Sequence, residues 1–144
     1  YVDRLKNFPT DQAPEVLFVQ LSTNDATNNV PMGSVSDSTD MEDFDVSTTI
    51  GAIEYIIAYA KKTWNCEVVF YTNAKYNNAQ YESLVKDLYQ IQEKWGIGIV
   101  DFYYYKDMDP LSDETLASYM ADAIHPNAMG YRWMGEVFAE YLSK

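Results

Sequence analysis

Three short apolar segments constrain the fold of this chain more than any other feature. They cover residues 15–21, 66–72 and 97–102, and each is a mostly apolar run rather than an alternating pattern. Such runs are typical of strands buried on both faces of a parallel sheet. A helical pattern follows each of them, so the chain reads strand–helix–strand–helix–strand–helix. This order predicts an α/β domain with a parallel sheet, right-handed crossovers and helices on both faces.

Apolar stripes and capping residues indicate where the helices lie. One helix is predicted over residues 46–64, and a second begins at a cap on Asn77 or Asn78 and ends at Gly96. A short helix capped by Ser112 follows the third strand. The apolar stripes of the two long helices are Ile50, Ile53, Ile57, Ala60 and Trp64 in the first and Tyr81, Leu84, Val85, Leu88, Ile91 and Trp95 in the second.

Length and composition exclude several classes of protein. The 144 residues are enough to bury one core, and we expect residues 1–144 to form a single domain. The net charge of −12 argues against nucleic-acid binding and against attachment to anionic membranes. No apolar run reaches the length of a membrane span. Cys66 is the only cysteine, so we expect no disulfide framework and no thiolate metal site. We also expect no other metal site and no cofactor.

The only histidine of the chain lies in a stretch suited to acid–base chemistry. His125 follows Asp122 by three residues, and a turn would bring the two side chains together. Histidine exchanges a proton near neutral pH, and an acid at its second nitrogen fixes its tautomer and orientation. Pro126 and the capping residue Asn127 then start a last helix from about Ala128. Its predicted apolar face is Tyr131, Met134, Phe138, Tyr141 and Leu142. A solvated loop histidine beside a chance acid is the alternative interpretation.

A second polar segment, residues 22–29, follows the first strand, and we expect it to form a loop. In open α/β sheets, ligands bind beyond the carboxyl ends of the strands. Asn24 lies at that end, and the loop with His125 can return to the same edge. The amide of Asn24 could donate a hydrogen bond to a developing oxyanion. Capping of a turn is its alternative role.

Together these two segments resemble sequence blocks of the SGNH or GDSL-type hydrolases. Residues 22–25 read Ser-Thr-Asn-Asp where that family has Gly-x-Asn-Asp, and Asp122, His125 and Pro126 match its Asp-x-x-His-Pro block in full. The resemblance implies a three-layer α/β/α fold on a parallel, flavodoxin-like sheet. It also implies ester hydrolysis, with His125 as base, Asp122 as its orienting acid and Asn24 as an oxyanion donor. The implied substrates are acyl esters, with acetylated carbohydrate as one class.

Two blocks of that family have no counterpart in this sequence. The chain has no Gly-Asp-Ser with a nucleophilic serine and no second-block glycine, and Ser22 replaces the third-block glycine. We therefore expect the chain to be the C-terminal part of a longer hydrolase, whose first strands, N-terminal segment and nucleophile lie outside it. Alone it is then expected to be inactive. The alternatives are a non-catalytic binding module on the same fold and a structural α/β domain with a chance histidine motif.

Other segments have simpler interpretations than catalysis or ligand binding. Ser34 and Ser36 lie within a long loop, without the strand-to-helix turn that presents a nucleophile. Cys66 enters the second strand at its N-terminal end and is expected to be a small core residue. The acidic loop over residues 37–45 lacks the spacing of a calcium loop. The aromatic run over residues 102–105 can stack on a sugar or pack in the core.

Overall fold

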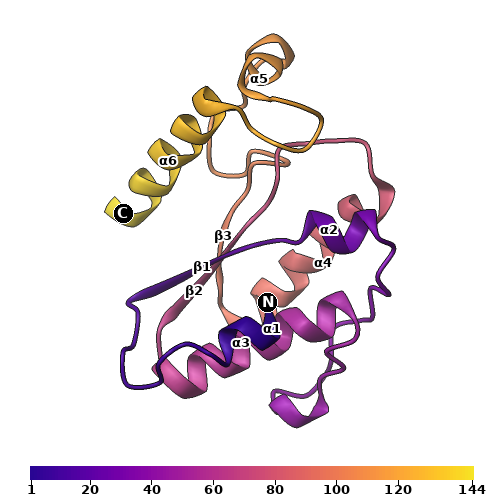
Figure 1. Cartoon of the computed structure of the whole chain (residues 1–144), viewed down its shortest axis with the longest axis vertical. Helices are drawn as coiled ribbons and strands as arrows, with labels where there is room; N and C mark the ends of the chain where they lie inside the picture. Colours follow the sequence, from indigo (N-terminus) through magenta and orange to yellow (C-terminus); the bar gives the residue numbers. More distant parts are fainter. The chain divides into compact units, whose positions relative to one another are not determined.

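The three segments that the sequence predicts to be strands form a three-stranded sheet. The computed structural model describes residues 1–144, and its sheet has the order β1-β2-β3 (Figure 1). The strands are β1 (Val16–Gln20), β2 (Glu67–Tyr71) and β3 (Gly98–Val100). β1 and β2 pair in parallel, from Val16 opposite Glu67 to Gln20 opposite Tyr71. Each strand is somewhat shorter than predicted, and the α/β fold class is confirmed.

The chain divides into two compact units. The first comprises Tyr1–Tyr71 and Asn78–Ile99, and the second comprises Thr72–Asn77 and Val100–Lys144. The first unit holds β1, β2 and the long helices that follow these two strands. The second holds the segment after β3, with the candidate histidine. The assignment of residues 1–144 to a single domain stays a prediction.

Two long helices follow β1 and β2 in the first unit. α3 (Thr49–Trp64) begins three residues later than predicted, because the Thr48 hydroxyl caps it, and α4 (Ala79–Trp95) begins at the cap Asn78. Gly96 ends α4 at φ 65°, a left-handed conformation that glycine adopts without strain. The predicted stripes are buried at Ile50, Ile53, Ile57, Ala60, Trp64, Tyr81, Leu84, Val85, Leu88 and Ile91, and half-buried at Trp95. No helix of the chain is both long and apolar enough to span a membrane.

The first unit also contains three short helical segments, one before β1 and two between β1 and α3. They are α1 (Val2–Leu5), α2 (Thr23–Thr27) and the 3₁₀ turn η1 (Met41–Asp43). The sequence predicts a loop directly after β1, and this prediction is wrong. The Ser22 hydroxyl accepts a hydrogen bond from the Asp25 N–H at 3.1 Å and so caps α2.

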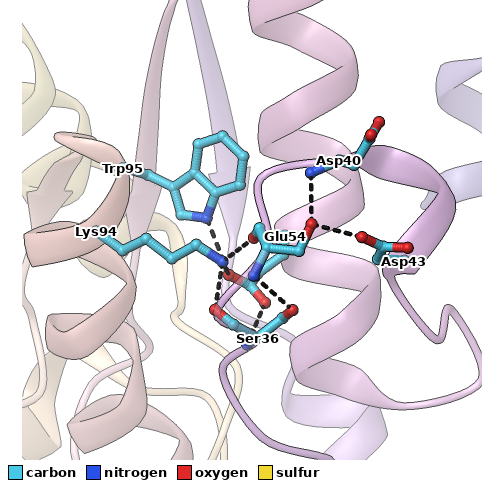
Figure 2. Close-up of polar contacts among 7 residues, drawn as sticks. Ser36, Asp40, Asp43, Glu54, Lys94 and Trp95 are labelled. Carbon is cyan, nitrogen blue, oxygen red and sulfur yellow. Dashed lines mark hydrogen bonds and ion pairs between the residues drawn. The ribbon is translucent and has the colours of Figure 1, made fainter.

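A buried ion pair holds the long acidic loop before α3, which covers residues 30–45, against the two long helices (Figure 2). The side chain of Glu54, in α3, is fully buried, and its carboxylate lies 2.5 Å from Lys94 Nζ in α4. The carboxylate also accepts the Trp95 indole N–H at 3.0 Å and the Ser36 amide at 2.9 Å. Lys94 donates in addition to the carbonyl oxygens of Ser36 and Ser38. The loop is therefore anchored through its backbone, since three of its main-chain groups bond to this pair.

In the second unit, α5 (Asp113–Tyr119) and α6 (Ala128–Ser143) follow β3. Ser112 caps α5 as predicted, by accepting a hydrogen bond from the Thr115 N–H at 3.2 Å. Phe102, fully buried after β3, packs edge-on against Trp133 of α6, with ring centroids 5.0 Å apart. Aromatic packing therefore joins the segment after β3 to α6.

The apolar face of α6 differs from the predicted one. Met134 is buried as predicted, whereas Tyr131 and Leu142 are each 57% exposed. The face turned inward starts at Gly130 and continues through Trp133 and Met134 at helical spacing. Tyr131 follows Gly130 by one residue, which rotates its side chain by about 100° away from this face.

Candidate active site

Asp122 and His125 form a hydrogen-bonded pair in the turn between α5 and α6. The Nδ1 atom of His125 lies 2.8 Å from Oδ2 and 3.0 Å from Oδ1 of Asp122. The Oδ1 atom also accepts the backbone N–H groups of His125 at 2.7 Å and Ile124 at 2.8 Å. These two backbone hydrogen bonds, and then the one from the imidazole, lower the pKa of Asp122 to about 2. The contact predicted from the three-residue spacing is present.

This geometry gives the two ring nitrogens of His125 different roles. An ionised carboxylate is an acceptor only, so the neutral imidazole carries its proton on Nδ1 and its lone pair on Nε2. The side-chain surfaces of His125 and Asp122 are 69% and 59% exposed, so the imidazole is open to a reacting group. The pair can therefore take a proton on Nε2 while Asp122 stabilises the imidazolium.

Backbone contacts close the turn that carries this pair. Met120 and Pro126 form an isolated antiparallel bridge across it. One residue further in, the Ala121 N–H donates to the His125 carbonyl oxygen at 2.8 Å. The main chain before the pair is thus hydrogen-bonded to the main chain after it, between the end of α5 and the start of α6.

Asn127 and Gly130 connect the turn to α5 and α6. The Asn127 Oδ1 accepts the Gly130 N–H at 3.1 Å, which is the predicted cap, and its Nδ2 donates to the Ser118 carbonyl at 2.8 Å. Its own N–H donates to the Tyr119 carbonyl at 2.8 Å. A Cβ on Gly130 would lie 2.2 Å from that carbonyl oxygen, so only glycine permits this approach. Sequence reasoning found the cap but missed the contact with Ser118 and the need for Gly130.

Asn24 lies in α2, just beyond the carboxyl end of β1, and is exposed. It lines a groove of about 530 Å³ in the first unit, together with residues at the start of α3. Its neighbour Asp25 accepts a hydrogen bond from the Thr49 hydroxyl at 3.0 Å, which ties α2 to α3. Because Asn24 and His125 belong to different units, their predicted convergence stays a prediction.

The nucleophilic side chains weighed in the sequence occupy structural positions. The Ser36 hydroxyl accepts the Ser38 N–H at 3.0 Å, and Ser34 lies in the same loop of the first unit. Cys66 is buried, as predicted, and burial raises the pKa of its thiol. A raised pKa disfavours the reactive thiolate. That the nucleophile lies outside the chain stays a prediction.

Comparison with known proteins assigns the chain to a family. The sequence profile of GDSL-like Lipase/Acylhydrolase matches residues 1–138, which is nearly the whole chain. The chain belongs to this family. Its membership of the GDSL-like family confirms the resemblance read from the two sequence blocks and supports a hydrolase of the SGNH type. No curated protein sequence matches it.

Solved structures share the fold of this GDSL-like chain. A protein from Lactobacillus plantarum has a TM-score of 0.73 and 20% identity, over 97% of this chain and 71% of that one. Two proposed GDSL-like lipases, from Bacteroides ovatus and Bacteroides uniformis, have TM-scores of 0.65 and 0.68 at 18% and 20% identity. The match covers 99% of this chain in both cases, but only 58% and 57% of the Bacteroides proteins. At these identities the likeness demonstrates the fold.

The aromatic run of this GDSL-like chain is divided between the core and the surface. Phe102 and Tyr103 are buried, so the packing interpretation is confirmed for them, whereas Tyr104 is 42% exposed. The ammonium of Lys75, from the loop after β2, lies 5.7 and 5.8 Å from the ring centroids of Tyr103 and Tyr104. The sequence does not reveal Lys75 as a partner, because nearly thirty positions separate it from the rings.

Carboxylates of the acidic loop accept hydrogen bonds from nearby serines. Asp43 accepts the Ser38 hydroxyl at 2.6 Å, and Asp45 accepts the hydroxyl and N–H of Ser47 at 2.6 and 3.0 Å. The hydrogen bonds from the Ser47 hydroxyl and N–H lower the pKa of Asp45. Within residues 1–144, no three His, Cys, Asp or Glu side chains gather in a way that could hold a metal ion.

Proposed function

We propose that this chain carries the base of a serine ester hydrolase, with His125 as general base, Asp122 as its orienting acid and Asn24 as an oxyanion donor. The contact between Asp122 and His125 Nδ1 carries the proposal, because it leaves Nε2 free to take a proton. Membership of an acylhydrolase family supports the ester substrate. The substrates we propose are acyl esters, including O-acetyl groups on carbohydrate.

In the proposed reaction a serine hydroxyl attacks the ester carbonyl while its proton passes to His125 Nε2. The tetrahedral oxyanion accepts a hydrogen bond from the Asn24 amide, and the imidazolium is stabilised by Asp122. When the C–O bond breaks, the imidazolium returns the proton to the departing alcohol. Water then attacks the acyl-enzyme with the same base, which releases the carboxylic acid and restores the serine.

We further propose that this serine is supplied by a segment outside residues 1–144. The chain has no Gly-Asp-Ser, and Ser36 is engaged in ordering its own loop. β1 is an end strand of the sheet, and its apolar Val16 and Leu17 are only half-buried. Another strand could pair with this edge, since unpaired N–H and C=O groups along an edge strand attract further strands. We propose an N-terminal segment of the same protein as that partner.

Variants of the longer protein, with its N-terminal segment, test this proposal by hydrolysis of p-nitrophenyl acetate. We expect His125→Ala to lower kcat by about 10⁶-fold, as loss of the base does in serine hydrolases. Asp122→Asn should cost less, about 10⁴-fold, since it disturbs the tautomer but leaves the base in place. Ser36→Ala serves as the control and should retain full activity.

A serine-directed fluorophosphonate tests the external serine separately from the role of His125 as base. It should label the longer protein on one serine and leave the 144-residue chain unmodified. Stoichiometric labelling of the short chain at Ser34 or Ser36 would contradict an external nucleophile. Full activity of His125→Ala would contradict the role of the base. Ester binding without turnover by the longer protein would favour the non-catalytic binding module.

A further inference from the structure

The exposure of the Asp122–His125 pair raises the question of what holds it in place. More than half of each side-chain surface is exposed, so close packing cannot fix their orientation. The hydrogen bonds from the Ile124 and His125 N–H groups set Asp122 relative to the imidazole. They do not set the turn relative to the helices on either side of it. That second task requires contacts at the base of the turn.

Asn127 makes contacts of this kind with both helices. Its Nδ2 donates to the Ser118 carbonyl at the end of α5, and its Oδ1 accepts the Gly130 N–H in the first turn of α6. Its backbone N–H donates to the Tyr119 carbonyl. The side chain thus uses its donor end on one helix and its acceptor end on the other. Aspartate has only acceptors, and serine is too short to reach both ends, so neither can replace the amide.

We propose that Asn127 is a positioning residue for the Asp122–His125 pair, because it joins the end of α5 to the start of α6 across the base of their turn. The inference rests on the proposed function of that pair. Asn127 does not touch the reacting atoms. It keeps the imidazole in the orientation from which Nε2 can reach the nucleophile, and Gly130 provides the space for this joint.

Two substitutions test the bond from Asn127 to the Ser118 carbonyl separately from the helix cap on Gly130. Asn127→Asp and Asn127→Ser both keep an acceptor for the Gly130 N–H, and both lose the amide donor to Ser118. Aspartate also directs a negative oxygen toward the Ser118 carbonyl. Asn78→Asp is the matched control, because the Asn78 Oδ1 caps α4 by accepting the Tyr81 N–H at 2.9 Å and lies outside the turn.

Nuclear magnetic resonance of the chain shows whether loss of the Asn127 contact loosens the Asp122–His125 pair, and its signals are unambiguous because His125 is the only histidine. The imidazole ¹⁵N shifts report which nitrogen carries the proton. We expect Asn127→Asp and Asn127→Ser to lower the fraction of the Nδ1–H tautomer and to speed exchange of the Ile124 and His125 amide protons at least about 10-fold. Asn78→Asp should change neither. Far-UV circular dichroism verifies that each variant is folded, and the serine variant replaces the aspartate variant if the latter unfolds.

Activity of the longer protein distinguishes failure of this inference from failure of the proposed function. We expect Asn127→Ser to lower kcat about 10-fold with KM within twofold, as misplacement of a catalytic group does. Unchanged His125 signals and unchanged kcat in a folded Asn127→Ser variant would overturn the positioning role. If the signals change while His125→Ala remains fully active, the joint exists and the catalytic role of the pair is wrong.

Discussion

The buried pair of Glu54 and Lys94 permits a quantitative test of what orders the acidic loop. We consider Lys94→Met, which keeps the alkyl stem of the lysine and removes its ammonium. In the native chain that group lies 2.5 Å from the Glu54 carboxylate and is bonded to the Ser36 and Ser38 carbonyl oxygens. The side chain of Glu54 is fully buried, and that of Lys94 is 16% exposed. The substitution therefore leaves a buried carboxylate without its cation.

Removing one member of a buried ion pair costs about 3–5 kcal/mol, because the remaining charge is desolvated and uncompensated. We expect Lys94→Met to lower the free energy of unfolding by about 3–4 kcal/mol, since the lysine retains some contact with solvent. For a chain of this size each kcal/mol shifts the melting temperature by about 2–4 °C, so the shift should be about 10 °C.

Urea denaturation followed by tryptophan fluorescence measures this change, with Lys86→Met as the control. Lys86 lies on the same helix, and its contact with Glu82 at 3.4 Å is exposed. Exposed pairs contribute little, so the control should change the free energy of unfolding by less than about 1 kcal/mol. The double variant Glu54→Leu/Lys94→Met should be at least about 1 kcal/mol more stable than the sum of the single effects predicts.

Two results would refute this reasoning. If Lys94→Met costs no more than Lys86→Met, the ammonium does not compensate the buried carboxylate. If the effects of Glu54→Leu and Lys94→Met simply add, the two side chains are not energetically coupled. Either result would indicate that the loop is ordered by the aromatic packing of Phe44 against Trp95 instead. The ring centroids of these two residues lie 6.1 Å apart.

The remaining predictions concern the turn between α5 and α6. Gly130→Ala should destabilise the chain by about 1–3 kcal/mol, because its Cβ would overlap the Tyr119 carbonyl. Gly135→Ala, in open space on the same helix, should stabilise it by about 0.5–1 kcal/mol; thermal melts of both variants decide, and equal effects would contradict the close approach. The ¹³C carboxyl signal of Asp122 should titrate near pH 2, because its folded pKa lies below the ordinary value. The stability that this depressed pKa contributes is present above about pH 4 and is lost as the pH falls toward 2; a midpoint near pH 4 would show that the turn does not hold the carboxylate.

Elements whose signals are local in sequence were predictable. The apolar run at residues 15–21 is a strand, and the caps at Asn78 and Ser112 start helices, because a few neighbouring residues decide each of these features. The helix α2 was not predictable. It is five residues long, too short for an apolar stripe, and it is tied to α3 by the long-range bond between Asp25 and Thr49.

The same difference between local and long-range contacts explains which parts of the candidate site could be predicted. Asp122 and His125 are three residues apart, so their contact could be predicted from the sequence alone. The cap function of Asn127 was also readable, whereas its bond to Ser118 depends on how α5 and α6 meet. Glu54 could be noticed as an acid on an apolar helix, but its partner Lys94 is 40 positions away and no spacing rule connects them.

The hydrogen bonds that orient His125 all lie within a short stretch of chain, and this affects how the turn responds to fluctuations. Asp122 and His125 close a loop of three residues, and Ser118 and Asn127 close one of nine. Short loops lose little conformational entropy on closing. A local opening of the turn can therefore be reversed without any long-range contact having to re-form. The contacts that set the orientation of the imidazole all lie within residues 118–130, so none of them depends on a more distant part of the chain.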